Sequence, residues 1–230
     1  YAPWIDAMVR LEGPAVHDLQ VIFIEDWYLG TDVSLDDLLH QSPPRFDDGA
    51  PVQIIDTGPN ALHEPLRQLS QVAFHAARRE LIITTPYFVP DEPTVTALHA
   101  AARRGVATTL ILPRRNDSPL VHLASRGYYQ ALFDAGVRIH EYHAGLLHAK
   151  TITIDGEVGL MTTANIDRRS FELNFEVSLT CFDASFAREL RGLQRTYLEA
   201  AAAGDLDAWG RRSATQRIAQ NTAGLLSPLL

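Results

Sequence analysis

The chain has 230 residues, of which 46% are hydrophobic, and its formal net charge is −8 at pH 7. Such a length can bury the core of one large domain, and no apolar run approaches the roughly 20 residues that a membrane-spanning helix needs. The acidic balance argues against a long nucleic acid as partner, and Cys181, the single cysteine, excludes an intrachain disulfide.

The N-terminal segment predicts a strand followed by a helix. Ile5–Glu12 has the composition of a strand, and Gly13-Pro14 opens a helix that we expect to run to about Tyr28, since proline fits the first turn. Residues 30–50 combine paired aspartates with Ser42-Pro43-Pro44, which is the composition of a linker.

From residue 52 onward, predicted strands and helices alternate. Gly105 and Gly136 stand where helices end, since glycine readily adopts the left-handed conformation of a C-cap. We expect strands at 52–56, 81–85, 106–112, 137–142 and 173–180, and helices at about 62–79, 92–104, 120–135 and 184–202. This alternation predicts an α/β fold with a mixed β-sheet sandwiched between helices.

A β-hairpin is predicted around Asp155-Gly156, because this pair suits the positive φ angles of a type I′ turn. Counting outward from a two-residue turn pairs Lys150 with Met161 and His148 with Thr163. His148, Lys150, Thr163 and Asn165 then project from one side of the hairpin, and Thr162 faces away from His148. An imidazole, an ammonium and two hydrogen-bonding groups together predict a site for a phosphate.

The segment 173–179 places Glu176 on the polar face of an alternating strand. A carboxylate beside a catalytic imidazole can accept its Nδ1–H, which leaves Nε2 free to attack. The alternative is an edge strand whose polar face meets water, and the spacing favours neither interpretation.

Taken together, these residues resemble the signature of the phospholipase D superfamily. The signature is His-x-Lys, then Asp after four residues, then an Asn that follows a Gly/Ser-type pair. The wider context is similar to bacterial cardiolipin synthases, most clearly in Thr85–Asp91, Ala164–Phe171 and Leu173–Glu176. Thr162 stands where the family usually has glycine, and this substitution puts catalytic competence in question.

The resemblance implies one half of a pseudo-twofold architecture. Residues 1–35 would be the last strand and helix of a first phospholipase D-like half, residues 36–50 a linker, and residues 51–230 the second catalytic half. The first half's own histidine motif would precede Tyr1. The family also implies a bacterial inner membrane location, through anchoring segments outside this chain, with the fragment itself soluble.

The family chemistry is phosphatidyl transfer. One histidine attacks the phosphodiester to form a phosphohistidine, a second protonates the departing alkoxide, and an acceptor alcohol reverses the process. The resemblance implies cardiolipin synthesis from two phosphatidylglycerol molecules with release of glycerol, without metal or cofactor. It assigns catalysis to His148, Lys150 and Glu176 and phosphate contacts to Lys150, Thr163 and Asn165. Asp155, at the turn, is expected to be structural.

The expected partners are phosphatidylglycerol, the membrane surface, and either the missing first half or a second copy of this chain. Two other functions stay open from the sequence. One is a phosphodiesterase or nuclease that pairs two copies of His148 in a homodimer. The other is a non-catalytic half that binds lipid.

Overall fold

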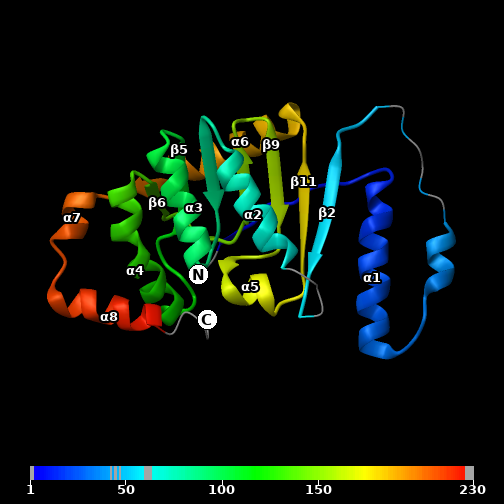
Figure 1. The fold of residues 1–230 in the computed structure, drawn as a ribbon, viewed down its shortest axis with the longest axis horizontal. Coiled ribbons are helices and arrows are strands. Elements are labelled where there is room, and N and C mark those ends of the chain that lie inside the picture. Colours follow the sequence, from blue (N-terminus) through cyan, green and yellow to red (C-terminus); the bar gives the residue numbers. More distant parts are fainter. Residues whose placement is uncertain (1–2, 42, 44–45, 47, 60–63, 226–230) are drawn as a thin grey trace.

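The computed structural model of the chain describes residues 3–41, 43, 46, 48–59 and 64–225. Its centre is an eight-stranded mixed sheet with the strand order β12-β6-β5-β3-β8-β9-β11-β2. The strands β3, β5 and β6 run parallel to one another, and the other neighbours pair antiparallel. In chain order these strands are β2 (Val52–Thr57), β3 (Glu80–Thr84), β5 (Ala107–Pro113), β6 (Arg138–Tyr142), β8 (Thr151–Ile154), β9 (Val158–Thr162), β11 (Glu176–Cys181) and β12 (Ala201–Ala203) (Figure 1).

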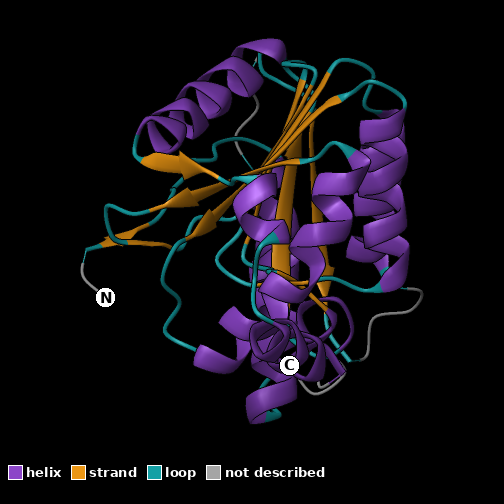
Figure 2. Cartoon of the chain, turned by 90° about the vertical axis from the view of Figure 1, so that its left-hand side faces the viewer, coloured by secondary structure: helices purple, strands orange, loops and turns teal. Residues whose placement is uncertain are grey.

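Helices cover both faces of this sheet (Figure 2). The helices α2 (Pro65–Ala76), α3 (Glu92–Arg103) and α4 (Pro119–Ala135) pack on one face, and α6 (Ala184–Glu199) packs on the other. Because strand side chains alternate between faces, Ile83 joins the α2–α4 layer whereas Ile82 joins the α6 layer. The predicted α/β sandwich is confirmed.

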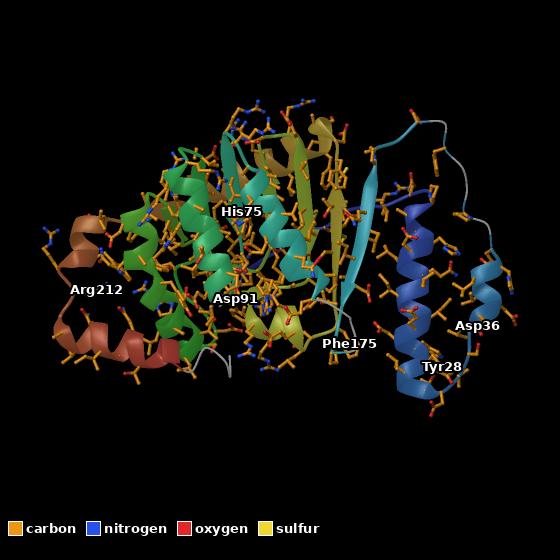
Figure 3. The ribbon with its side chains drawn as sticks, viewed as in Figure 1. Tyr28, Asp36, His75, Asp91, Phe175 and Arg212 are labelled. Atoms are coloured by element: carbon orange, nitrogen blue, oxygen red, sulfur yellow. The ribbon has the colours of Figure 1, made fainter. Side chains whose placement is uncertain are left out.

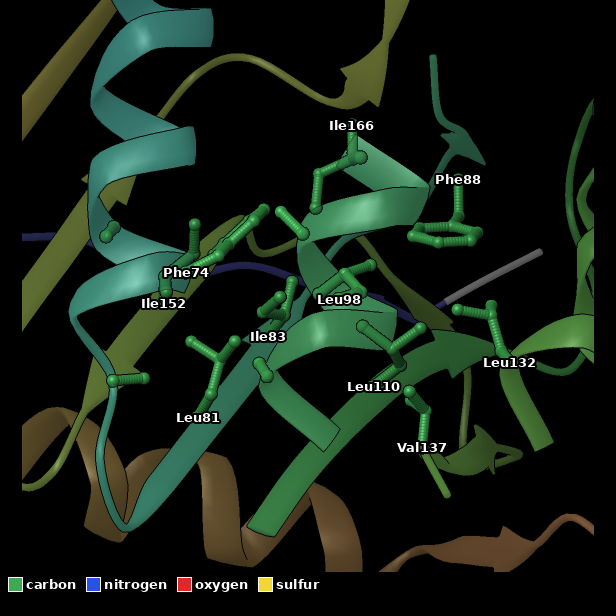
Figure 4. Packing of buried hydrophobic residues seen from close by; sticks show 14 of the residues in the cluster. Phe74, Leu81, Ile83, Phe88, Leu98, Leu110, Leu132, Val137, Ile152 and Ile166 are labelled. Atoms are coloured by element: carbon green, nitrogen blue, oxygen red, sulfur yellow. The ribbon is translucent and has the colours of Figure 1, made fainter. Parts of the chain in front are cut away.

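The larger hydrophobic core lies between the sheet and α2, α3 and α4, as Figure 4 shows in close-up. Leu81, Ile83, Leu98 and Leu110 are each 0% exposed there. Burying one such side chain contributes about 1.5–3 kcal/mol. This layer therefore supplies much of the stability of the rigid sheet that carries the candidate site.

The opposite face is fixed by a buried polar network centred on Gln194 of α6. The Gln194 carboxamide accepts a hydrogen bond from Thr153 Oγ1 (2.6 Å) and donates to Thr151 Oγ1 (3.1 Å) and the Ile82 carbonyl (3.2 Å). Because each of these groups is buried, the network ties α6 to β3 and β8 in one arrangement.

Two short parallel ladders flank the main sheet. The strand β1 (Trp4–Ile5) pairs with β7 (Leu146–Leu147), and β10 (Ile166–Asp167) pairs with β4 (Phe88–Val89). Figure 1 shows α1 beside β2 at one end of the molecule and α7 and α8 at the other. The remaining helices are α1 (Ala15–Thr31), the 3-10 helix η1 (Asp36–His40), α5 (Arg168–Glu172), α7 (Leu206–Gly210) and α8 (Ala214–Leu225).

Most of the long predicted elements agree with the structure to within three residues. The predicted strand 5–12 is wrong beyond Ile5, because only Trp4 and Ile5 find a partner strand and a ladder requires one. The predicted strand 173–180 begins only at Glu176, since a turn after α5 occupies the preceding residues. Residues 42, 44–45 and 47 of the predicted linker, and 62–63 of the predicted helix, lie outside the described residues.

Within the described ranges, none of the helices combines the length and the apolar character that crossing a bilayer requires.

Candidate active site

The hairpin that carries the histidine motif has the predicted turn but not the predicted register. Asp155 and Gly156 have φ angles of 55° and 69°, and the Glu157 N–H donates to the Ile154 carbonyl (2.9 Å), as in a type I′ turn. The ladder, however, pairs Ile154 with Val158, so Glu157 is an extra residue on the β9 side. The predicted register is therefore wrong by one residue.

The shifted register changes which residue lies opposite Lys150. The Thr162 N–H donates to the Lys150 carbonyl (3.1 Å), and Met161 pairs with Thr151 instead. Thr162 thus shares the face of Lys150, contrary to the expectation that it points away from the site. His148 and Lys150 also precede β8, which begins at Thr151.

His148 lies between β7 and β8, where its backbone N–H donates to the Ile5 carbonyl (2.7 Å). Its side chain is 27% exposed, and its ring stands 4.6 Å from the ring of Trp4, centroid to centroid. Its Nδ1 is 3.0 Å from Asp6 Oδ2. In the tautomer with the proton on Nδ1, this bond orients the ring and leaves Nε2 without a proton.

Lys150 places its ammonium directly against His148. The Nζ atom donates to the His148 carbonyl (2.8 Å) and lies 3.1 Å from Nε2 and 3.3 Å from Nδ1. Lys150 is only 9% exposed, and it is the single lysine of the chain. Burial lowers the pKa of Lys150, and the charges of Asp6, Glu176 and Asp167 oppose this shift without cancelling it.

The carboxylate beside His148 is Asp6, not the expected Glu176. Burial by itself would raise the pKa of Asp6, but its hydrogen bonds to His148 and to the Ala7 N–H outweigh that effect, so the pKa is lowered. Glu176 instead accepts from Asn174 Nδ2 (3.1 Å) and acts on Lys150 through its charge. The expected His148–Glu176 hydrogen bond is absent among the contacts of the described residues.

Asn165 and Thr163 occupy different environments. The Asn165 Oδ1 atom is buried without a hydrogen-bond partner, and its backbone N–H donates to Ser170 Oγ (3.1 Å). Thr163 is exposed, and its Oγ1 accepts from the Val177 N–H (2.9 Å), which already uses one lone pair. The Asn165 side chain therefore keeps hydrogen-bonding capacity that the protein does not use, whereas Thr163 Oγ1 is engaged by the backbone.

Thr163 and Glu176 open onto a cavity of about 380 Å³ between α1 and the start of β11. The cavity is also lined by apolar side chains, among them Phe23 of α1 and Phe175, which directly precedes β11. Figure 3 shows Tyr28 on α1 and Phe175 near the lower ends of β11 and β2. The N-terminal helix thus forms one wall of the space next to Glu176.

Asp155 lies at the opposite end of β8 from Lys150. Its carboxylate accepts hydrogen bonds from the backbone N–H groups of Arg78 (3.0 Å), Arg79 (2.7 Å) and Glu80 (2.9 Å). Burial would raise the pKa of Asp155, but these three amides and the Arg79 charge lower it. The carboxylate anchors the hairpin turn to the start of β3.

Thr162, at the family's glycine position, has a clear structural role. It is not among the described residues with positive φ, so its backbone does not require glycine. Its Oγ1 lies 2.8 Å from Ser178 Oγ and accepts from the Ala164 N–H (3.0 Å). The hydroxyl therefore bridges β9 to β11.

Asp6 was not singled out from the sequence, although a signal for it exists. Asp6 follows an apolar pair and precedes α1 by nine residues, and Glu176 likewise follows an apolar residue and precedes α6 by eight. Two acidic residues at similar distances before long helices would have identified Asp6 and Glu176 as corresponding candidate site residues.

In the described part of the chain, no cluster of three or more His, Cys, Asp or Glu side chains is arranged to hold a metal ion.

Residues 72–195, just over half of the chain, match the family model described as "Cardiolipin synthase, PLD-like domain". The chain is 37% identical over 230 residues to cardiolipin synthase A of Yersinia pseudotuberculosis (serotype O:1b, strain IP 31758), covering 99% of the chain and 47% of that protein. It is 40% identical over 233 residues to cardiolipin synthase A of Buchnera aphidicola subsp. Acyrthosiphon pisum, with the same coverage. The chain thus spans about half the length of these relatives.

Solved structures share the fold at low sequence identity. The phosphatidylserine synthase of Haemophilus influenzae Rd KW20 superposes with a TM-score of 0.61 at 14% identity, over 82% of this chain and 48% of that one. Nuc of Salmonella typhimurium, a phospholipase D family member, superposes with a TM-score of 0.58 at 16% identity, over 68% of this chain and 99% of that one. The fold is that of the phospholipase D family.

Proposed function

Because the chain belongs to the cardiolipin synthase family of phospholipase D-like domains, we propose that the full-length protein containing it transfers phosphatidyl groups through a phosphohistidine. The proposed reaction joins two phosphatidylglycerol molecules into cardiolipin and releases glycerol. The chain would supply the second half of a two-histidine site, with residues 1–35 as the end of the first half.

One observation supports this proposal most directly. The Lys150 ammonium lies 3.1 Å from His148 Nε2 in a position with little access to water, so a phosphorus atom bonded to Nε2 would place its oxygens beside a fixed positive charge. Phosphoryl-type transfer builds charge on these oxygens, and a preorganised cation stabilises that charge.

The proposed reaction has two steps. One histidine Nε2 attacks phosphorus, a P–N bond forms, the P–O bond to glycerol breaks, and the second histidine donates a proton to the leaving oxygen. A hydroxyl of the acceptor lipid then gives its proton to the second histidine and attacks phosphorus, and the P–N bond breaks. His148 is one of these two imidazoles.

The other site residues have proposed supporting roles. Asn165 would donate its amide hydrogens to a non-bridging oxygen, with Thr163 assisting from the edge of the site. Glu176, together with Asp167, would offset the Lys150 charge, which accords with their influence on its pKa. Asp6 would orient His148 through Nδ1 in the arrangement of the structure.

The test uses the full-length protein on vesicles of phosphatidylglycerol. We expect cardiolipin and glycerol in equal amounts, and an acid-labile phosphorylated enzyme when the reaction is quenched early. His148→Ala should remove cardiolipin formation, whereas His75→Ala, an exposed histidine on α2 (Figure 3), should keep it. A wild-type protein that neither forms cardiolipin nor releases glycerol would contradict the proposal.

A further inference from the structure

A second cavity, of about 750 Å³, adjoins the histidine motif and is separate from the hydrogen-bond cluster around His148. We name it the arginine cavity, and its lining residues are Arg114, Arg115, Tyr142, His143, Ala144, Gly145 and Leu146. Leu146 belongs to β7, and His148 follows two residues later. Two residues of chain span at most about 7 Å, so the Leu146 edge of the cavity lies close to His148.

The cavity is locally basic in an acidic chain. Arg114 and Arg115 are both exposed, and neither has a carboxylate within ion-pair distance in the described ranges. By contrast, Arg67, Arg126 and Arg191 are each neutralised by a glutamate. With a net charge of −8, two adjacent unpaired guanidinium groups favour an anion, and the planar fork of arginine suits a phosphate.

Hydrogen bonds hold both segments that form the rim of the cavity, residues 114–115 and residues 142–146. The Arg114 N–H donates to the Tyr142 carbonyl (2.8 Å), and the buried Asn116 side chain donates to the Pro86 carbonyl (2.9 Å) just beyond the arginines. The His143 N–H donates to the Ala200 carbonyl (3.1 Å). The arginines are therefore presented from a fixed backbone, which lowers the entropic cost of binding.

We propose, on the basis of the proposed function, that the arginine cavity binds the phosphodiester of the acceptor phosphatidylglycerol. In cardiolipin two phosphates are joined by a glycerol bridge, so the phosphate that does not react must lie one bridge length from the phosphorus at His148. The arginine cavity is a basic site, and its Leu146 edge precedes His148 by two residues in the chain. Its volume falls within the range of small-molecule sites, about 300–1,000 Å³.

In the second step, the acceptor's terminal hydroxyl attacks the phosphatidyl-histidine. A P–O bond forms, the P–N bond breaks, and the hydroxyl proton passes to the second histidine. The acceptor's own phosphodiester is unchanged throughout and stays with Arg114 and Arg115. The arginines thereby favour phosphatidylglycerol over water as acceptor.

The test compares the full-length wild-type protein with the double variant Arg114→Gln/Arg115→Gln on vesicles of phosphatidylglycerol diluted in phosphatidylcholine. We expect the half-saturating phosphatidylglycerol content for cardiolipin formation to rise about tenfold or more. The share of phosphatidic acid, the product with water as acceptor, should rise as well. The glycerol released in the first turnover, which reports the donor step, should stay unchanged.

A matched control, Arg188→Gln/Arg195→Gln, removes two exposed arginines from α6 and should behave as wild type. Unchanged cardiolipin kinetics in the Arg114/Arg115 variant would overturn the assignment, and so would an equal loss of the glycerol burst. If wild type itself makes no cardiolipin, the proposed function fails first and the assignment with it. An active wild type with an unaffected double variant contradicts the assignment alone.

A competition experiment separates a lipid headgroup from a free phosphate. Glycerophosphoglycerol, the headgroup without acyl chains, should inhibit cardiolipin formation by wild type and about tenfold less well by the double variant. Inorganic phosphate should inhibit far more weakly. Equal inhibition by inorganic phosphate would assign the cavity to a free anion and overturn the acceptor proposal.

Discussion

At the scale of single residues, Lys150 combines the chemistry of the site with a cost in stability. It is the single lysine in a chain that otherwise carries its positive side-chain charge on 19 arginines. An ammonium is a compact point charge, whereas a guanidinium is larger and delocalised. The buried position against His148 suits the compact cation, and its burial there lowers the pKa.

We expect Lys150→Met to slow transfer strongly while making the fold more stable. In the full-length protein, kcat should fall by about 100-fold or more, because a preorganised charge is lost. The free energy of unfolding of the 230-residue chain should rise by about 1 kcal/mol, because a buried cation is removed. Urea unfolding and vesicle assays measure the two effects, and a large loss of stability would contradict burial as the main cause of the lowered pKa of Lys150.

The sign of the pH dependence follows from the same shift. The pKa of Lys150 is lower in the folded chain than its ordinary value of 10.5, so the unfolded chain binds more protons between the two values. Wild-type stability should therefore gain from this group as pH rises toward 10.5, and Lys150→Met should lack that gain. Equal slopes in both proteins as the pH approaches 10.5 would refute the assignment.

At the scale of elements, the hairpin turn shows what local chemistry decides. Asp155-Gly156 was correctly predicted to turn the chain, because the positive φ angles of the two residues are a local property. The register was wrong, because the extra residue Glu157 depends on how β9 pairs with both β8 and β11. The two-residue strands β4, β7 and β10 escaped prediction for a similar reason, since so short a ladder carries no periodicity.

We expect Asp155→Asn to lower the free energy of unfolding by about 1–2 kcal/mol at pH 7, through weaker hydrogen bonds to the three amides. Asparagine tolerates positive φ, so the turn itself should persist. Because the folded-state pKa of Asp155 is lowered, its stabilisation is present above 3.8 and lost as pH falls below that value. The two proteins should converge in acid denaturation, and a constant difference down to pH 2 would refute this account.

Gly159 determines how closely α6 approaches the sheet. A Cβ at this position would lie 2.8 Å from two ring atoms of Phe186, closer than real contacts allow, and 3.3 Å from Leu190, which is a tight contact. Gly159→Ala should therefore lower the free energy of unfolding by about 1–3 kcal/mol. Thermal melts should show a partial recovery when Phe186→Leu is added, and a neutral Gly159→Ala would show that α6 can shift outward freely.

At the scale of the whole molecule, the site joins segments that are far apart in sequence. The N-terminal strand β1 pairs with β7, which brings Asp6 to His148 across 142 positions. Glu176 lies on β11, which is separated from β8 by β9 alone, and its charge acts on Lys150. Two carboxylates from the two proposed halves thus converge on one histidine–lysine pair.

The two carboxylates can be distinguished by their effect on pH profiles in the full-length protein. If Asp6 orients His148, Asp6→Asn should move the pH profile of kcat/KM and lower kcat by about tenfold or more. Glu176→Gln should mainly affect the part of the kcat/KM pH profile in which Lys150 loses its proton. Indistinguishable profiles for the two variants would show that the site rearranges when the first half is present.

The sequence by itself determined the α/β alternation, the turn at Asp155-Gly156 and the His148-x-Lys150 spacing, because these depend on neighbours in the chain. The family followed from the same short-range motifs. The tertiary structure decided the hairpin register, the contact of Asp6 with His148, the bridging role of Thr162 and the arginine cavity beside β7. Each of these depends on the pairing of distant segments, which is selected by the packing of the whole core and not by any local pattern.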